Sequence, residues 1–218
     1  MLTGGAGGRA MSLAFEEIFS IADAFLGIPM AGRTDSWILA DAAAAHGIPR
    51  DSPGLVEFPG VYVRHLAMEI LNKGPRYGIM PGIPSLLEAL ADRDDAYLAL
   101  LTGNYEAGAR LKLEHFDLWR YFPCGAFGDG AADRNGLVPK ALARVAAFGG
   151  PVFAASDAIV IGDTPLDVAC AKAGGARSIA VATGNHTVDE LRESGADVVF
   201  QDLSDLEAVL KAIRPGLP

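Results

Sequence analysis

The sequence has few basic residues and no long hydrophobic segment. Its 18 lysines and arginines stand against 27 aspartates and glutamates in 218 residues, which gives a net charge of −9. Proteins that mainly hold nucleic acid or an anionic membrane need clustered Lys and Arg, so both classes are disfavoured. No apolar run approaches the roughly 18 residues that cross a bilayer, and the N-terminal MLTGGAGGRAM lacks the pattern of a signal peptide. We therefore expect a cytoplasmic protein.

Cysteine is also scarce. Cys124 and Cys170 are the only two, and they lie in apolar surroundings without a CxxC or Cys/His cluster. We expect buried free thiols and no metal bound through sulfur. The opening GGAGG has no strand before it, although a dinucleotide-binding loop requires one, and no serine lies in GxSxG. A nicotinamide-binding protein and an α/β-hydrolase are therefore disfavoured.

Apolar residues make up 50% of the chain and charged residues 21%, which is typical of a folded protein with a substantial core. The chain up to about Gly74 is predicted to be helical. The spacing of its apolar residues predicts helices over 11–25, from 34 or 35 to 46, and over 61–72. No strand is expected before residue 95.

From Pro81 onward, predicted strands and helices alternate. The expected strands are 96–101, 124–127, 158–161, 178–182 and 197–200. The expected helices are 84–93, 105–115, 139–148, one that ends at 173, 188–194 and 204–213. Strands separated by helices predict an α/β fold with a Rossmann-like parallel sheet and helices on both faces. Because ligands gather at the carboxyl ends of such strands, the chemistry is expected there.

Residues that can bind an anion follow the first of these strands. Thr102 offers a hydroxyl at the strand end, and Gly103 and Asn104 lead into a helix with free backbone N–H groups. Either Thr102 or Asn104 could instead cap that helix. The segment alone is a weak signal.

Two carboxylates follow the strand AIVI. Asp163 stands where the strand stops and Asp167 lies four residues on, with Pro165 suited to the first helical turn. Two like charges held close together are costly unless a cation joins them, and oxygen ligands suit Mg²⁺. The alternative is that one Asp caps the helix and the other is a favourable charge in its first turn. We favour the metal site.

Lys140 is predicted to start a helix, where a positive charge is unfavourable because the amino end is already positive. A functional use of the charge would explain its position. A solvated surface lysine is the alternative.

In this order, LLTGN, the lysine of VPKAL and VIGDTPLDVACAKAGGA resemble the second, third and fourth motifs of the haloacid dehalogenase-like (HAD) hydrolase superfamily. The resemblance is to its phosphatase branch and to phosphoglycolate phosphatases in particular. It implies an α/β core over 79–218, a helical cap over 9–78, and a remnant of a core loop over 1–8.

The resemblance also implies an activity, namely Mg²⁺-dependent hydrolysis of a small phosphorylated metabolite through an aspartyl-phosphate. Thr102, Gly103 and Asn104 would contact the phosphoryl oxygens, and Lys140 would neutralise charge on the phosphate. Arg33 of the cap would contact the leaving group, although an exposed cap arginine is an equal alternative.

For the metal, the resemblance implies that Asp163 binds Mg²⁺ directly. Asp167 would ligate it or orient a bound water. A dehalogenase of the same superfamily needs no Mg²⁺, so the acidic GDTPLD segment disfavours that activity.

The family's first motif is absent. It is a strand ending in DxDGT, which carries the nucleophilic Asp and the acid/base Asp, and this sequence has no DxD after a strand. The missing strand would lie at the centre of the sheet, between the strands that end at Thr102 and at Asp163. We expect each of these strands to have an unpaired buried edge unless the sheet collapses, and we expect a chain of negligible activity and poor stability, as a truncated or mis-started enzyme. A natural pseudoenzyme with a binding role is the alternative.

Overall fold

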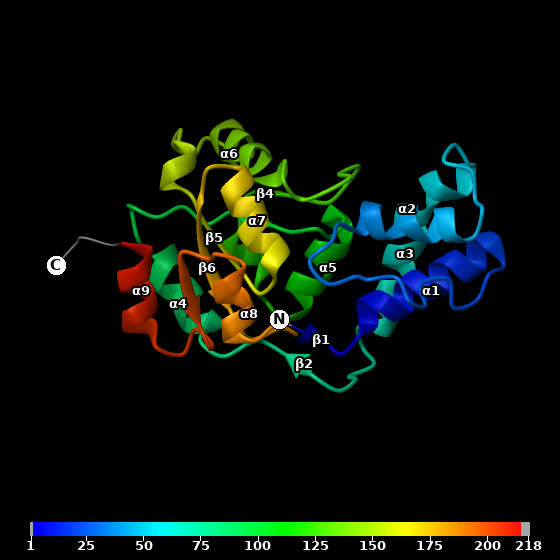
Figure 1. Cartoon of the computed structure of the whole chain (residues 1–218), viewed down its shortest axis with the longest axis horizontal. Coiled ribbons are helices and arrows are strands. Elements are labelled where there is room, and N and C mark those ends of the chain that lie inside the picture. The colour runs from blue at the N-terminus through cyan, green and yellow to red at the C-terminus, as the bar shows by residue number, and fades with distance from the viewer. Residues whose placement is uncertain (1, 215–218) are drawn as a thin grey trace. The chain divides into compact units, whose positions relative to one another are not determined.

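The computed structural model describes residues 2–214, which fall into two units (Figure 1). The first unit comprises residues 2–78, 103–119 and 128–132. The second comprises residues 79–102, 120–127 and 133–214.

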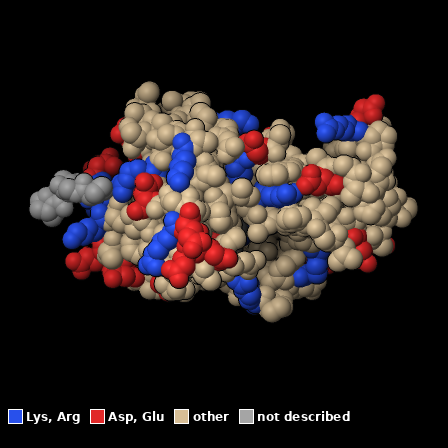
Figure 2. All heavy atoms as spheres, in the orientation of Figure 1, with Lys and Arg blue, Asp and Glu red and all other residues tan. Residues whose placement is uncertain are grey.

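Charged side chains of both signs are spread over the surface. Figure 2 shows Lys and Arg interspersed with Asp and Glu on the face in view. None of the helices formed by residues 2–214 combines the length and the apolar run that a bilayer crossing needs. Cys124 and Cys170 are both buried free thiols, as the sequence predicts.

The first unit is built from helices and one short antiparallel ladder. Its helices are α1 (Ala6–Phe19), α2 (Asp35–Ala45), α3 (Pro53–Glu69) and α5 (Glu106–His115). Its strands are β1 (Leu2–Thr3) and β2 (Tyr77–Gly78), with Leu2 opposite Gly78. The expectation of no strand before residue 95 is therefore wrong, because a two-residue strand leaves no hydrophobic alternation to detect.

Several helix boundaries differ from the prediction, and two of them have clear local reasons. α1 ends at Phe19 and not at residue 25, because Ser20 adopts a left-handed conformation with φ of 57°. α3 begins at Pro53, eight residues earlier than expected. Pro53 is a favourable first helical residue, but Pro59 inside the helix concealed that start.

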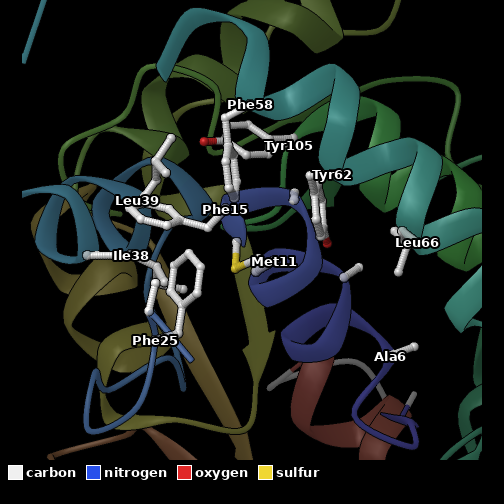
Figure 3. Packing of buried hydrophobic residues seen from close by; sticks show 14 of the residues in the cluster. Ala6, Met11, Phe15, Phe25, Ile38, Leu39, Phe58, Tyr62, Leu66 and Tyr105 are labelled. Atoms are coloured by element: carbon white, nitrogen blue, oxygen red, sulfur yellow. The ribbon is translucent and has the colours of Figure 1, made fainter. Parts of the chain in front are cut away.

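An aromatic cluster forms the core of the first unit, where α1 packs against α3 (Figure 3). Phe15, Phe58 and Tyr62 are 0% exposed. The rings of Phe58 and Tyr62 are stacked, with centroids 6.3 Å apart and an interplanar angle of 2°. Tyr105, just before α5, meets Tyr62 edge to face at 6.0 Å. Such buried rings supply much of the apolar area that stabilises the unit.

The second unit has parallel strands flanked by helices and contains most of the predicted core over 79–218, whereas residues 103–119 and 128–132 of that range lie in the first unit. Its strands are β3 (Leu100–Leu101), β4 (Gly125–Ala126), β5 (Ile159–Gly162), β6 (Arg177–Val181) and β7 (Val198–Phe200). Its helices are α4 (Ile83–Ala91), α6 (Leu137–Ala147), α7 (Pro165–Ala173), α8 (Val188–Glu193) and α9 (Leu206–Ile213). Short 3₁₀ turns lie at Trp119–Tyr121 and Ala155–Asp157.

The strands of the second unit form two separate parallel ladders. β3 pairs with β4, while β5, β6 and β7 form the other sheet in that order. Within residues 2–214 no ladder joins β3 to β5. The predicted strand over 96–101 is reduced to two paired residues because β4 offers a partner only to those two.

Asp197 connects the last two strands. Its carboxylate Oδ2 accepts hydrogen bonds from the Ser178 amide and hydroxyl, both at 2.7 Å. The hydroxyl in turn accepts from the Asp197 amide at 3.0 Å. Because Ser178 donates to the ionised form, the pKa of Asp197 lies below its ordinary value.

We predict that Asp197→Ala lowers the free energy of unfolding at pH 7 by about 1–2 kcal/mol, since two donors of Ser178 lose their acceptor. The loss should be complete above the ordinary aspartate pKa of about 4 and should shrink as the pH falls through the lowered pKa of the folded state. Urea unfolding at several pH values measures the loss of stability at pH 7 and its dependence on pH. Asp189→Ala, at an exposed side chain, is the control and should have little effect.

Candidate functional site

The loop after β5 is shaped by a capping box. Thr164 is the N-cap of α7 and its hydroxyl accepts the Asp167 amide at 3.3 Å, while Asp167 Oδ2 accepts the Thr164 amide at 3.0 Å. Pro165 occupies the first helical turn, where its missing N–H costs nothing. The residues DTPLD therefore specify their own local structure and fix Asp163 directly before the helix.

Both carboxylate oxygens of Asp167 are used by the protein. Oδ2 also accepts the Asp163 amide at 3.1 Å and the Thr164 hydroxyl at 2.7 Å. Oδ1 forms an ion pair with Arg134 at 2.5 Å, and the two side chains are only 8% and 12% exposed. The helix-capping alternative left open by the sequence thus describes the contacts of Asp167. Its carboxylate orients the loop and has little capacity left for direct metal binding.

The carboxylate of Asp163 lies in a different setting from that of Asp167. It is partly buried, and a β-carbon at Gly184 would lie 2.6 Å from its Oδ2. Burial, and then the charge of Asp167, raise the pKa of Asp163. A carboxylate in this position is suited to a hard cation.

The two side chains of the predicted metal site therefore lie in different settings, and metal binding by Asp163 and Asp167 stays a prediction. Among residues 2–214 no three His, Cys, Asp or Glu side chains are grouped so that they could hold a metal ion. A cation at Asp163 would take its other ligands from water or from a phosphate, as Mg²⁺ commonly does.

The buried cation beside this loop is Arg134 and not Lys140. Lys140 lies on the first turn of α6 and its side chain is exposed. Arg134, just before α6, pairs with Asp167, and its carbonyl accepts a hydrogen bond from the thiol of Cys170 at 2.9 Å. An arginine in a polar turn resembles a surface residue in the sequence, so its burial is evident only from the packing of α6 against α7.

The loop after β3 is held by backbone contacts. In the second unit, the Thr102 amide donates to the Ala126 carbonyl at 3.0 Å. In the first unit, Gly103 accepts the Asp35 amide at 2.7 Å, and a β-carbon at Gly103 would lie 2.3 Å from the Arg33 carbonyl oxygen. Only glycine fits this approach of two backbones.

Neither Thr102 nor Asn104 caps the following helix. Tyr105 is the N-cap of α5, and the amide of Glu106 donates to the carboxylate of Asp129 at 2.8 Å. The side chain of Asn104 instead accepts a hydrogen bond from Lys112, and its carbonyl accepts the Gly128 amide at 2.9 Å. The capping alternative is therefore wrong for this loop.

Arg33 is paired within the first unit. Its guanidinium lies 4.1 Å from the centre of the Trp37 ring and forms an ion pair with Asp41 at 2.5 Å. Its side chain is 19% exposed, so it is not a freely solvated arginine. These contacts hold the start of α2 and leave the predicted contact with a leaving group untested.

The sequence does not point to the three residues after Arg33 as part of a site. In the structure, however, they are hydrogen-bonded to the loop before α5 and to residues 128–131. The Thr34 hydroxyl donates to the Ala131 carbonyl at 2.6 Å, and the amide of Tyr105 donates to Asp35 Oδ2 at 2.9 Å. The Ser36 hydroxyl donates to the Gly128 carbonyl at 2.8 Å. A Thr-Asp-Ser run signals a helix N-terminus, but nothing local reveals which loops it binds.

Known proteins of one family are similar to this chain. A HAD-hydrolase-like family model matches residues 135–206, which include Asp163 and Asp167. A phosphoglycolate phosphatase of Rhodospirillum rubrum is 30% identical over 191 residues, which are 86% of this chain and 76% of that protein.

Solved structures share the fold. A predicted phosphatase from Clostridium acetobutylicum has a TM-score of 0.67 at 20% identity, with 96% of this chain and 92% of that chain covered. A hydrolase from Pseudomonas syringae has a TM-score of 0.63 at 20% identity, with 94% and 92% covered. At this identity the likeness shows the α/β fold alone.

We predict that Arg134→Met lowers the free energy of unfolding by about 2–4 kcal/mol, because it leaves the buried carboxylate of Asp167 without its cation. Lys140→Met removes the same charge at an exposed position of the adjacent helix and should cost less than about 0.5 kcal/mol. Urea unfolding of both variants is the measurement. Equal effects of the two substitutions would contradict the structural role of Arg134.

Proposed function

Because this chain belongs to the haloacid dehalogenase-like hydrolase family, we propose that its site is built for Mg²⁺-dependent hydrolysis of a small phosphate monoester of the phosphoglycolate type. The observation that supports this most directly is the carboxylate of Asp163. It stands at the carboxyl end of β5, is partly buried, and is fixed by the loop that Asp167 organises. A substrate at a strand end is the usual arrangement in this fold class.

Asp163 is the residue that would hold Mg²⁺. Its raised pKa reflects burial and a neighbouring carboxylate, and a cation removes both penalties on the charged form. When Mg²⁺ is bound, negative charge on the phosphoryl oxygens is offset. Asp167 acts indirectly, because its carboxylate accepts the amides of Asp163 and Thr164 and so holds the loop.

We assign to Arg134 the charge neutralisation that the family resemblance gave to Lys140. A guanidinium fixed in a poorly solvated site interacts more strongly with an anion than a solvated ammonium does. Arg134 is held by Asp167 on one side and by Cys170 through its carbonyl on the other. The exposed Lys140 has no such restraint.

The phosphoryl oxygens would be bound after β3. The hydroxyl of Thr102, the amide of Gly103 and the side chain of Asn104 are the donors that this loop offers. In the family reaction an aspartate attacks phosphorus in line, the bond to the leaving oxygen breaks, and water then hydrolyses the aspartyl-phosphate. That aspartate belongs to the DxDGT segment, which the 218 residues do not contain. We therefore propose that this chain by itself has no turnover.

The test compares the 218-residue chain with the same chain preceded by the in-frame upstream codons, if these encode a strand ending in DxDGT. We predict that only the longer chain hydrolyses p-nitrophenyl phosphate and phosphoglycolate, and that Mg²⁺ is required. In the longer chain, Asp163→Asn should lower the rate by at least about a hundredfold, because the principal metal ligand is lost.

Four outcomes would count against the proposal. Rapid Mg²⁺-dependent turnover by the 218-residue chain would show that the nucleophile lies within it. Inactivity of the longer chain on a panel of phosphate esters, or a stop codon directly upstream, would favour a non-catalytic binding protein. Metal-independent release of halide from 2-haloacids would favour the dehalogenase.

A further inference from the structure

A glycine lies directly against the carboxylate of Asp163. β5 and β6 are parallel, with Gly162 opposite Ala180, so Asp163 and the segment after β6 leave the sheet at the same edge. Gly184 lies in that segment. The three atoms nearest to a β-carbon at Gly184 would all belong to Asp163, with Oδ2 at 2.6 Å, Cγ at 3.0 Å and Cβ at 3.3 Å. The close approach therefore involves one particular side chain.

The backbone conformation does not require a glycine at position 184. Other glycines of the second unit have a positive φ, among them Gly175 with 71° and Gly195 with 79°, and a side chain there would be strained. Gly184 has no such φ. An alanine could therefore adopt the backbone of Gly184, and the nearest obstacle to its side chain is the carboxylate of Asp163.

The overlap is large on the scale of metal coordination. A carbon and an oxygen that are not bonded to each other lie about 3.3 Å or more apart, even in weak C–H···O contacts. A β-carbon at Gly184 would thus displace Asp163 Oδ2 by about 0.7 Å or turn the carboxylate into another rotamer. Mg²⁺ holds its oxygen ligands at about 2.0–2.1 Å in near-ideal octahedral geometry, so it tolerates little of such a shift.

The backbone of Asp163 is held on both sides and cannot easily follow a displaced carboxylate. Its amide donates to Asp167 Oδ2 at 3.1 Å, and Asp167 is itself paired with the buried Arg134. The residue before it, Gly162, belongs to the ladder between β5 and β6. A side chain at position 184 would therefore change the orientation of the Asp163 carboxylate and leave the loop in place.

We propose that Gly184 is a positioning residue of the metal site, because the absence of a side chain there lets the carboxylate of Asp163 keep the orientation in which it can bind Mg²⁺. The proposal rests on the proposed function in taking Asp163 as the residue that holds the metal. It adds a residue outside the segments LLTGN, VPKAL and GDTPLD, and one that has no side-chain ligand of its own. Gly184 acts on the metal only through Asp163.

A purely structural role for Gly184 would be to let the segment after β6 pack closely against the loop after β5. The two roles are separable, because a packing role lowers stability whenever a side chain is added at position 184. A positioning role depends on the carboxylate of Asp163, and Asp163→Ala removes the two nearest atoms, Oδ2 and Cγ. Gly60→Ala is the matched control, since a β-carbon at Gly60 of α3 would meet nothing within 4 Å.

The experiment uses the 218-residue chain and Mg²⁺ alone, so it requires no turnover. Mg²⁺ is titrated while the NMR signals of the Asp163 and Gly184 amides are followed, and urea unfolding is measured for each variant. We expect Gly184→Ala to weaken Mg²⁺ binding about tenfold or more, as for loss of a residue that orients a metal ligand. Its unfolding midpoint should stay close to that of the unaltered chain. Gly60→Ala should leave Mg²⁺ binding unchanged.

The variants that lack the carboxylate decide between the two roles. If Gly184→Ala also lowers the unfolding midpoint, that loss should vanish when Asp163→Ala is the starting chain, and its persistence there supports packing and overturns the proposal. Unchanged Mg²⁺ affinity of Gly184→Ala, or no Mg²⁺-induced shift in the unaltered chain, also overturns it. Inactivity of the longer chain on phosphate esters, with Mg²⁺ binding still dependent on Gly184, would refute the proposed function and leave this inference standing.

Discussion

The arrangement of the acidic loop depends on one carboxylate, that of Asp167. It accepts three hydrogen bonds from the two residues before α7 and forms an ion pair with Arg134. Nearly all of its bonding capacity is therefore used inside the protein. Such a buried group is stable only while every partner is present. The position of Asp163 follows from this, since its own amide is one of the donors. The loop that carries Asp163 is thereby held in place.

The two loops at strand ends are held by the same kind of contact. In each, a buried carboxylate accepts backbone amides of the loop, and a buried cation lies close by: Asp167 with Arg134 in the second unit, and Asp35 with Lys112 in the first. Backbone amides so engaged cannot rotate to make other contacts. Rigid loops lower the entropy lost on binding a small anion, which is the advantage of preorganisation.

Features encoded locally could be predicted from the sequence, and features that depend on distant partners could not. The start of α2 at Asp35 and the capping box of α7 follow from a few neighbouring residues, because N-cap chemistry is local. β1 and β2 were missed, since Leu2 becomes a strand only by pairing with Gly78. Arg134 and Lys112 were missed for a related reason. Whether a cation is solvated or buried is decided by helices that lie far away in the sequence.

The separation of β3 from β5 affects how well the backbone of β5 is protected from solvent. β5 pairs with β6 on one side only, and Ile161 within it is 36% exposed although its neighbour Val160 is buried. Backbone groups on the other side of β5 have no ladder partner in residues 2–214. β6, by contrast, is paired on both sides. Strand edges without a ladder partner open locally at a lower free energy than paired ones, so the free edge of β5 is expected to be less protected than β6.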